Sequence, residues 1–144
     1  MAKWTKETFE DSVKKNCIPH TCNVIVDLIK FAEECSDVAT WGRGEGYGTL
    51  TFKCKSDDYG IVPLFLITTH GQIKFQLNFL RNKVRKKEII RDYQLKLESN
   101  FMSDFGEVSY QADIFHDIGV MFNMQADVEK FKHTILGITD RLHQ

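Results

Sequence analysis

The sequence lacks any apolar run that approaches the roughly 18 residues needed to cross a membrane. Its N-terminus has no apolar stretch of the kind found in a signal peptide, so we expect a cytoplasmic protein without a membrane partner. Cysteine is scarce, with 4 residues in 144, which favours reduced thiols over a disulfide framework. The formal charge of -1 excludes a uniformly basic nucleic-acid-binding protein but is compatible with a local basic patch.

The chain has enough material for one folded domain. Its 144 residues include 42% hydrophobic and 27% charged side chains, which is typical of a globular protein with its own core. Phenylalanine occurs 11 times, so we expect that core to be rich in aromatic rings. No repeat or linker divides the sequence, and we predict a single domain over residues 1–144.

Apolar residues at helical spacing predict two helices near the N-terminus. Phe9, Val13 and Cys17 follow one another every four residues, which predicts a helix over about residues 5–16. A second helix is predicted over about residues 20–35. Its apolar face is broad, which indicates that this helix is well buried.

Between residues 49 and 79 the apolar pattern changes to that of β-strands. Residues 49–55 and 72–79 alternate between apolar and polar side chains, and residues 61–69 form an apolar run. His70-Gly71 predicts a two-residue hairpin loop. We therefore predict a three-stranded antiparallel β-meander. Pro63 predicts a bulge or partial pairing, because proline lacks the N–H that a central strand donates.

The two predicted hairpins agree on which face of the middle strand is buried. A two-residue loop at residues 70–71 places Leu66 opposite Phe75, and the first hairpin places Leu66 opposite Leu50. All of these residues then share one face of the sheet. The predicted core face consists of Leu50, Phe52, Cys54, Val62, Leu64, Leu66, Phe75, Leu77 and Phe79.

The C-terminal half is predicted to be mostly helical. Residues 82–99 have helical spacing, and so does the chain from residue 127 onward. Residues 100–117 have no clear pattern, and residues 118–123 are a candidate fourth strand. The sequence as a whole predicts an α+β fold with two N-terminal helices, the meander and C-terminal helices.

The opposite face of the predicted sheet carries an apolar stripe between lysines. Phe65 lies in the middle strand, and Lys53 and Lys74 flank it on the neighbouring strands. An open sheet with an aromatic stripe and a basic border is typical of a surface that binds single-stranded nucleic acid. Two other interpretations stay open. In the first interpretation, a helix covers this face and the lysines lie at its edges. In the second, the stripe contacts a protein partner or a second copy of the chain.

A glycine-rich loop at residues 41–48 joins the helical and strand-forming parts of the chain. Glycine at alternate positions predicts positive φ or a close backbone approach, and Trp41, Arg43, Glu45 and Tyr47 stand beside the glycines. Either the aromatic side chains turn into the core, or Arg43 and Glu45 contact a ligand. The glycine spacing does not match a dinucleotide-binding fingerprint, and we predict no cofactor.

Residues 81–91 form the strongest charge feature, with six cations among eleven residues. Within this segment, the residues predicted to contact a nucleic acid are Arg81, Lys83 and Arg85. A basic run of this kind binds phosphates in a salt-dependent way when it faces a nucleic acid. The alternative is a solvated helix face whose charge is offset elsewhere in the chain.

The sequence predicts no metal site and no catalytic residues. Cys17, His20 and Cys22 are spaced in a way that would suit zinc, but Cys22 and Cys35 lie on apolar helix faces, where cysteine usually acts as a small hydrophobe. The five histidines are scattered, and no nucleophile motif is present.

Three segments together carry a resemblance to a known family. They are Trp41-Gly-Arg-Gly-Glu-Gly-Tyr-Gly, Val62-Pro-Leu-Phe and Gly71-Gln-Ile-Lys-Phe. The chain resembles a family of small uncharacterised bacterial proteins in which a Trp-Gly-x-Gly loop precedes a β-meander. Thr49-Leu50 departs from the Ser-Phe pair expected there. The resemblance implies an arrangement of elements and no catalytic residues.

The leading hypothesis is a non-enzymatic binding module with nucleic acid as the favoured ligand. Its surface would combine the glycine-rich loop, the Lys53/Phe65/Lys74 sheet face and the basic segment. The first alternative is a protein-interaction module or homodimer that uses the apolar sheet stripe. The second is an enzyme that acts on a small molecule at the glycine-rich loop, which requires that loop to be open.

Overall fold

Residues that favour helix starts place the two N-terminal helices. The computed structural model describes residues 3–101 and 113–144. Helix α1 (Lys6–Asn16) begins with a capping box, in which the Thr8 N–H donates to the Thr5 side chain and the Thr5 N–H donates to the Thr8 side chain. Proline occupies the first turn of α2 (Pro19–Cys35), where its missing N–H costs nothing. Both predicted helices are confirmed.

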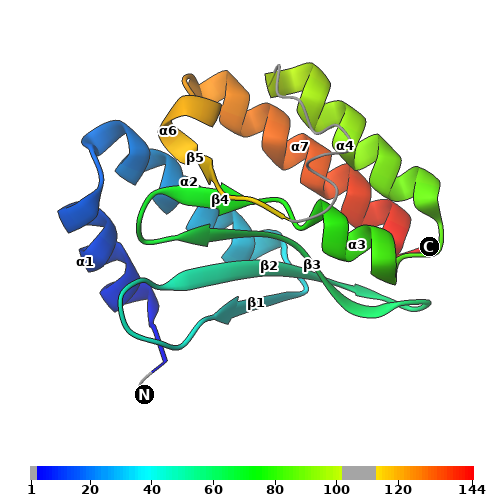
Figure 1. Ribbon diagram of the computed structural model, residues 1–144, viewed down its shortest axis with the longest axis horizontal. Coiled ribbons are helices and arrows are strands. Elements are labelled where there is room, and N and C mark those ends of the chain that lie inside the picture. The colour runs from blue at the N-terminus through cyan, green and yellow to red at the C-terminus, as the bar shows by residue number, and fades with distance from the viewer. Residues whose placement is uncertain (1–2, 102–112) are drawn as a thin grey trace.

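The strands form one antiparallel sheet with the order β1-β2-β3-β4-β5 (Figure 1). Its strands are β1 (Val38–Trp41), β2 (Thr49–Ser56), β3 (Gly60–Thr68), β4 (Gln72–Lys74) and β5 (His116–Asp117). The remaining helices are α3 (Leu77–Lys83), α4 (Lys87–Phe101), α6 (Ile118–Met121) and α7 (Gln125–Leu142). The α+β prediction and the central meander are confirmed, and short strands extend the sheet at both edges.

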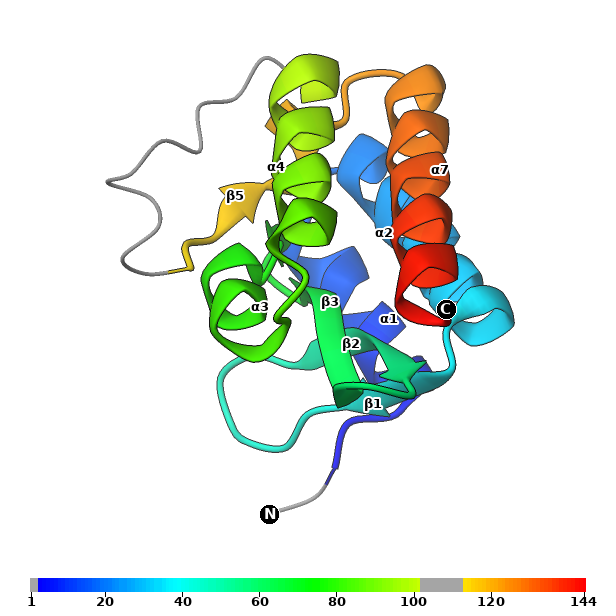
Figure 2. The same ribbon diagram turned by 90° about the vertical axis from the view of Figure 1, so that its right-hand side faces the viewer.

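The long helices cover one face of the sheet. Helices α2, α4 and α7 lie on the same side, and no helix of the described residues lies over the other side, which we call the open face (Figure 2). The alternative in which a helix covers the predicted stripe holds for Phe65, which is buried against Phe131 of α7, whereas Lys53 and Lys74 lie on the open face, where no described helix covers them. Within the part of the chain that the structure describes, no helix is both long and apolar enough to cross a membrane.

A bulge in β3 exchanges the two faces of that strand. Lys53 pairs with Pro63, but the preceding residue, Phe52, pairs with Phe65, so Leu64 is an extra residue. The irregularity predicted at Pro63 is confirmed. Its consequence was not predicted: beyond the bulge the strand is shifted by one residue, which turns the opposite set of side chains inward.

The second hairpin also differs from its predicted register. Leu66 pairs with Lys74, so the loop contains the three residues between Thr68 and Gln72 rather than two. Gly71 in this loop has φ of +79°, as a three-residue hairpin requires. The new register places Leu66 on the open face with Lys74.

These two changes correct the predicted core face. Phe65 is 1% exposed and Ile67 is equally buried, whereas Leu66 is only partly buried and Phe79 is exposed. The rest of the predicted core face is buried as expected. The predicted exposure of Phe65 is therefore wrong, and the interface with a protein partner or second copy stays a prediction without that central aromatic residue.

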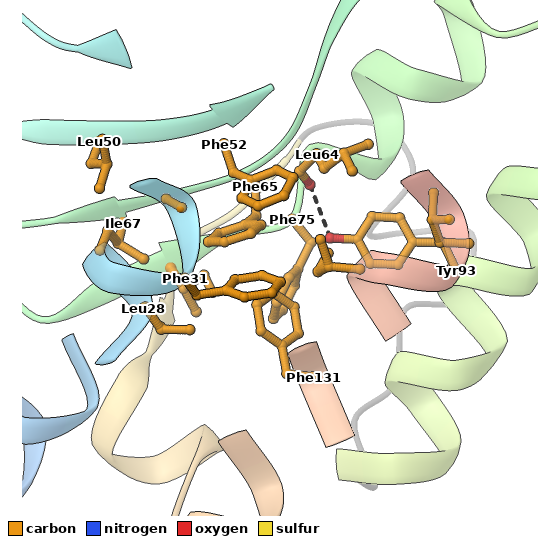
Figure 3. Close-up of a cluster of buried hydrophobic side chains, with 14 of the residues drawn as sticks. Leu28, Phe31, Leu50, Phe52, Leu64, Phe65, Ile67, Phe75, Tyr93 and Phe131 are labelled. Atoms are coloured by element: carbon orange, nitrogen blue, oxygen red, sulfur yellow. Dashed lines mark hydrogen bonds between the residues drawn. The ribbon is translucent and has the colours of Figure 1, made fainter. Parts of the chain in front are cut away.

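Aromatic rings fill the space between the sheet and the helices (Figure 3). Phe65 stacks on Phe52 with ring centroids 5.2 Å apart, and Phe52 stacks on Phe31 from α2 at 5.3 Å. Phe131 from α7 meets Phe65 edge-on at 4.9 Å. The predicted aromatic-rich core is confirmed, and it joins α2, α7 and the bulged strand in one cluster.

Tyr93 of α4 stabilises the bulge. Its hydroxyl donates a 2.9 Å hydrogen bond to the carbonyl of Leu64, the extra residue, and both groups are buried (Figure 3).

We expect Tyr93→Phe to lower the free energy of unfolding by about 1–3 kcal/mol, because the Leu64 carbonyl loses its hydrogen-bond donor in a site away from water. Denaturant unfolding measures this. The control Tyr47→Phe, on an exposed ring, should change stability by less than about 0.5 kcal/mol. Equal effects in the two variants would contradict this role.

The chain after β4 departs from the predicted elements. The strand predicted to reach residue 79 ends at residue 74, and the helix predicted over 82–99 is divided between α3 and α4. Residues 118–121 form α6 rather than a strand. Within the region that had no clear pattern, residues 102–112 lie outside the described residues.

Two features explain the early end of β4. Gln76 adopts a left-handed conformation with φ of 59°, which stops the strand. The Asp113 carboxylate then accepts hydrogen bonds from the N–H groups of Asn78 (2.7 Å) and Phe79 (3.2 Å) in the first turn of α3. Because this cap comes from a residue far along the chain, local sequence patterns could not reveal it.

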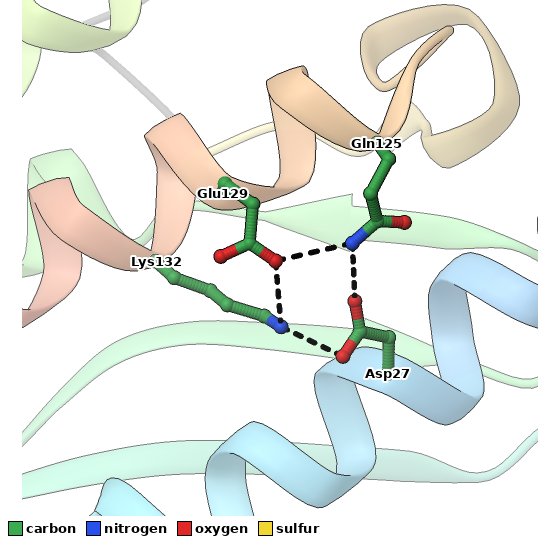
Figure 4. A network of polar contacts seen from close by, with 4 residues as sticks. All are labelled: Asp27, Gln125, Glu129 and Lys132. Carbon is green, nitrogen blue, oxygen red and sulfur yellow. Dashed lines mark hydrogen bonds and ion pairs between the residues drawn. The ribbon is translucent and has the colours of Figure 1, made fainter.

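A polar network joins α2 to α7 on the outside of the helical layer (Figure 4). The Lys132 ammonium lies 2.7 Å from Asp27 and 3.4 Å from Glu129, and the Gln125 amide donates to Asp27 at 3.1 Å. Partial burial works to raise the pKa of Asp27. The hydrogen bonds from Lys132 and Gln125 and the charge of Lys132 outweigh it, so the pKa lies below its ordinary value of 3.8.

A lowered pKa in the folded state means that ionised Asp27 stabilises the fold at neutral pH. This stabilisation is present above the unfolded-state pKa and is lost as pH falls through the folded-state pKa. We expect Asp27→Asn to cost about 1 kcal/mol at pH 7, because the ion pair is partly exposed. Urea unfolding at neutral pH and near pH 3 measures the difference, which should shrink at the lower pH. The control Glu34→Gln lies on the exposed side of α2 and should show no pH-dependent loss of stability. If Asp27→Asn costs the same unfolding free energy at both pH values, the stabilising role of ionised Asp27 is contradicted.

Candidate anion-binding site

The basic segment folds into a corner between α3 and α4. Val84, Ile89 and Ile90 are buried, and the cations around them are exposed except Arg81, which is partly buried. We call this surface the basic corner; it consists of Arg81, Lys83, Arg85, Lys86, Lys87 and Arg91. Residues 81–91 carry a net charge of +5, with six cations and the single anion Glu88, in a chain whose total is -1. Positive charge is therefore concentrated on one part of a protein that is otherwise acidic.

A first cavity lies where the basic corner meets the turn between β2 and β3. Its volume is about 440 Å³, and it is lined by Asp58, Tyr59, Lys83 and Arg85. The Tyr59 hydroxyl accepts a 3.1 Å hydrogen bond from the backbone N–H of Lys86, which holds the turn against the corner. The cavity thus offers two cations, one carboxylate and an aromatic ring from two different parts of the chain.

A second cavity lies on the α4 side of the same corner. Its volume is about 390 Å³, and it is lined by Arg81, Lys87, Arg91, Gln94 and Leu95. Arg81 donates to the side chain of Gln94, and Lys87 donates to the carbonyl of Arg81. These contacts hold the long side chains near one another, which reduces the entropy that an anion would have to overcome in binding them.

Two acidic groups near the corner have partners, whereas Asp58 lines the first cavity itself and Glu88 is exposed within the basic segment. Asp92 of α4 pairs with Arg141 of α7, and Glu98 accepts a 3.0 Å hydrogen bond from Gln94. Because the six cations of residues 81–91 outnumber the nearby carboxylates Asp58 and Glu88, the corner keeps a net positive charge, which attracts phosphates. Guanidinium groups such as those of Arg85 and Arg91 suit this purpose, because they bind phosphate oxygens in pairs.

The open face keeps the predicted lysines without the predicted aromatic residue. Lys53 lies opposite Pro63 and Lys74 opposite Leu66, and both lysines alternate with buried neighbours. The Lys74 ammonium lies 4.3 Å from the ring centroid of Phe115, just before β5. The prediction that Phe65 lies on the surface is wrong, because the bulge turns its side chain inward. Phe115 was not predicted because it lies in a segment without a clear pattern.

The glycine-rich loop packs against the N-terminal segment. The Trp4 backbone N–H donates to the Gly42 carbonyl at 3.0 Å, and the Trp4 indole N–H donates to the Gly44 carbonyl at 3.1 Å. A Cβ at Gly48 would come within 2.5 Å of the Trp4 ring, so glycine is required there. Trp4 therefore holds three glycines of the loop, whereas Arg43, Glu45 and Tyr47 between them are exposed, and the small-molecule enzyme hypothesis stays a prediction.

The four predicted loop residues have different environments. Trp41 is partly buried against Phe9, with ring centroids 5.3 Å apart, as one interpretation expected. Tyr47 is exposed beside His70, with centroids 5.6 Å apart, so its predicted placement in the core is wrong. Arg43 and Glu45 are exposed.

The predicted binding residues do not form one surface. The glycine-rich loop enters β2 and the β2–β3 turn leaves it, so they lie at opposite ends of this eight-residue strand (Figure 1). At about 3.3 Å per residue, the strand separates the loop from the first cavity by roughly 23 Å. Lys83 and Arg85 share a cavity, Arg81 lines the other, and the loop residues lie far from both.

Sequence reasoning missed several residues of the corner. Lys86, Lys87 and Arg91 belong to the recognised charge run, and their density was the available signal. Tyr59 and Gln94 had no local signal, because each reaches the corner from a different element. Comparison with protein-family models, with curated proteins and with solved structures finds no match to this chain.

Proposed function

We propose that this protein is a cytoplasmic binding module for single-stranded nucleic acid and that the ligand binds at the basic corner. The observation that carries the proposal is the concentration of net charge +5 in residues 81–91, folded around two cavities in a chain of total charge -1. A local positive field of this kind attracts a phosphate backbone even when the whole protein is slightly acidic.

The composition of the two cavities favours an unpaired strand over a duplex. Tyr59 lines the first cavity together with Lys83 and Arg85, and an aromatic ring beside phosphate-binding groups is a stacking platform for an exposed base. Arg81, Lys87 and Arg91 line the second cavity, where a neighbouring phosphate would bind. A strand that crosses the corner would place a base in one cavity and its backbone along the other.

Fluorescence anisotropy with labelled single-stranded DNA, single-stranded RNA and duplex DNA over a range of salt concentrations tests the proposal. If four or five phosphates are contacted, the logarithm of the affinity should fall with the logarithm of the salt concentration with a slope of about -3. Single strands should bind more tightly than the duplex. Absence of binding at low salt, or affinity that does not depend on salt, would contradict the proposal.

A further inference from the structure

Three potential metal ligands from distant parts of the sequence meet at the C-terminal end of α7. Asp37 precedes β1, Cys54 lies in β2 and His143 directly follows α7. One carboxylate oxygen, the thiol sulfur and one imidazole nitrogen all lie within 4.8 Å of one another. The Asp37 Oδ2 and His143 Nε2 atoms are 2.6 Å apart. This cluster is separate from the basic corner and plays no part in the proposed nucleic-acid binding.

The surrounding structure holds each of the three groups in place. Cys54 is fully buried on the inner face of the sheet. The Asp37 carboxylate accepts a 2.7 Å hydrogen bond from the backbone N–H of Lys55, which fixes its orientation. The His143 backbone N–H bonds to the Thr139 carbonyl at 3.0 Å and so continues the last turn of α7. The positions of all three ligands therefore follow from the fold.

Two of the three groups in the cluster are partly exposed to solvent, and the third is buried. The Asp37 and His143 side chains are 27% and 43% exposed, whereas Cys54 lies behind them. An ion that contacts all three groups would have to separate the carboxylate from the imidazole. Their hydrogen bond would then be replaced by two bonds to the ion, with donor separations somewhat longer than 2.6 Å.

The donor set indicates which ion would bind. One sulfur, one nitrogen and one oxygen suit Zn²⁺, whereas Mg²⁺ and Ca²⁺ require oxygen ligands. Three protein ligands leave the fourth tetrahedral position for water. Binding of a divalent ion forms the metal–sulfur bond and releases the Cys54 thiol proton to solvent.

We propose that Asp37, Cys54 and His143 form a binding site for Zn²⁺ that ties the C-terminal end of α7 to the sheet. The site joins β2, the segment before β1 and the last helix, so a bound ion stabilises the packing of α7. Leu142, the residue before His143, is already buried in the core, so the helix end needs no large movement to accept the ion.

Cobalt is the probe for this proposal, because a cysteine–Co²⁺ bond gives a charge-transfer absorption in the near ultraviolet. The full chain titrated with Co²⁺ should develop this absorption, and Zn²⁺ should remove it by displacement. His143→Gln should weaken Co²⁺ binding by more than the roughly 10- to 100-fold expected for loss of an outer-shell partner. Cys54→Ser should abolish the absorption.

Matched controls separate this site from the other cysteines and histidines. Cys22→Ala and His133→Gln alter residues outside the cluster and should leave the Co²⁺ spectrum and affinity unchanged. Zn²⁺ should raise the melting temperature of the wild-type protein and of both controls, but not of His143→Gln. Since His143 is exposed near the chain end, its replacement should not prevent folding. A folded wild-type protein without the absorption, or equal affinities for wild type and His143→Gln, would overturn the proposal.

Discussion

Replacement of Phe65 by alanine is expected to lower the free energy of unfolding by about 3–5 kcal/mol, the usual cost of emptying a buried phenylalanine site. Phe65 is 1% exposed and its ring meets Phe52 and Phe131. Replacement of its neighbour Leu66 is expected to cost about 1 kcal/mol or less, because that side chain lies on the open face. The contrast follows from the bulge at Pro63, which turns Phe65 inward and Leu66 outward.

Guanidinium chloride unfolding of the two alanine variants beside wild type measures this contrast. The two positions are adjacent and belong to the same strand, so each serves as the control for the other. Without the bulge, the regular alternation of β3 would bury Leu66 and expose Phe65. A larger loss of stability in Leu66→Ala than in Phe65→Ala would therefore contradict the register.

Charge reversal at the basic corner is expected to remove most nucleic-acid binding. In the double variant Arg85→Glu with Lys87→Glu, one reversed residue belongs to each cavity, and both side chains are exposed. Loss of two phosphate contacts should reduce the magnitude of the salt slope by about 1.4 and the affinity at 0.1 M salt by roughly 25-fold. The introduced carboxylates should reduce the affinity further by repulsion. Anisotropy titrations over a salt series measure both quantities.

A matched variant tests whether position or total charge is responsible. Lys14→Glu with Lys15→Glu changes the net charge by the same amount at exposed positions near the end of α1. This variant should keep an affinity close to that of the wild-type protein. Similar losses in the two double variants would mean that net charge alone governs binding, which would contradict a site at the corner. Circular dichroism should show that both variants stay folded.

Local patterns predicted the parts of the fold that local interactions determine. The helical spacing of apolar residues placed α1 and α2 correctly. The strand alternation and the turn near Gly60 identified the first hairpin. The predicted register is confirmed next to the turn, where Lys55 pairs with Ile61. Pro63 also indicated a bulge, for the physical reason that proline cannot donate to a neighbouring strand.

The errors arose where distant contacts decide the structure. The bulge is stabilised by the Tyr93 hydroxyl, which comes from another element and satisfies the Leu64 carbonyl. The end of β4 depends on the Asp113 cap. Since one slipped residue exchanges the two faces of a strand, a correct outline of the sheet still produced a wrong surface residue at Phe65.

The candidate site was predicted in part for the same reasons. The density of cations in residues 81–91 depends on sequence alone and was recognised. The bend between α3 and α4, the approach of Tyr59 and the division into two cavities depend on tertiary packing. The same holds for the cluster of Asp37, Cys54 and His143, because no spacing relates residues so far apart in the chain.

The central claim is that the basic corner, rather than the open face or the glycine-rich loop, binds single-stranded nucleic acid. Backbone amide chemical shifts of the ¹⁵N-labelled protein, followed during titration with a short single-stranded oligonucleotide, test it most directly. The predicted result is a set of shifts confined to Tyr59 and residues 81–95. Shifts at residues 49–55 and 72–74, or at residues 41–48, with the corner unchanged, would contradict the claim.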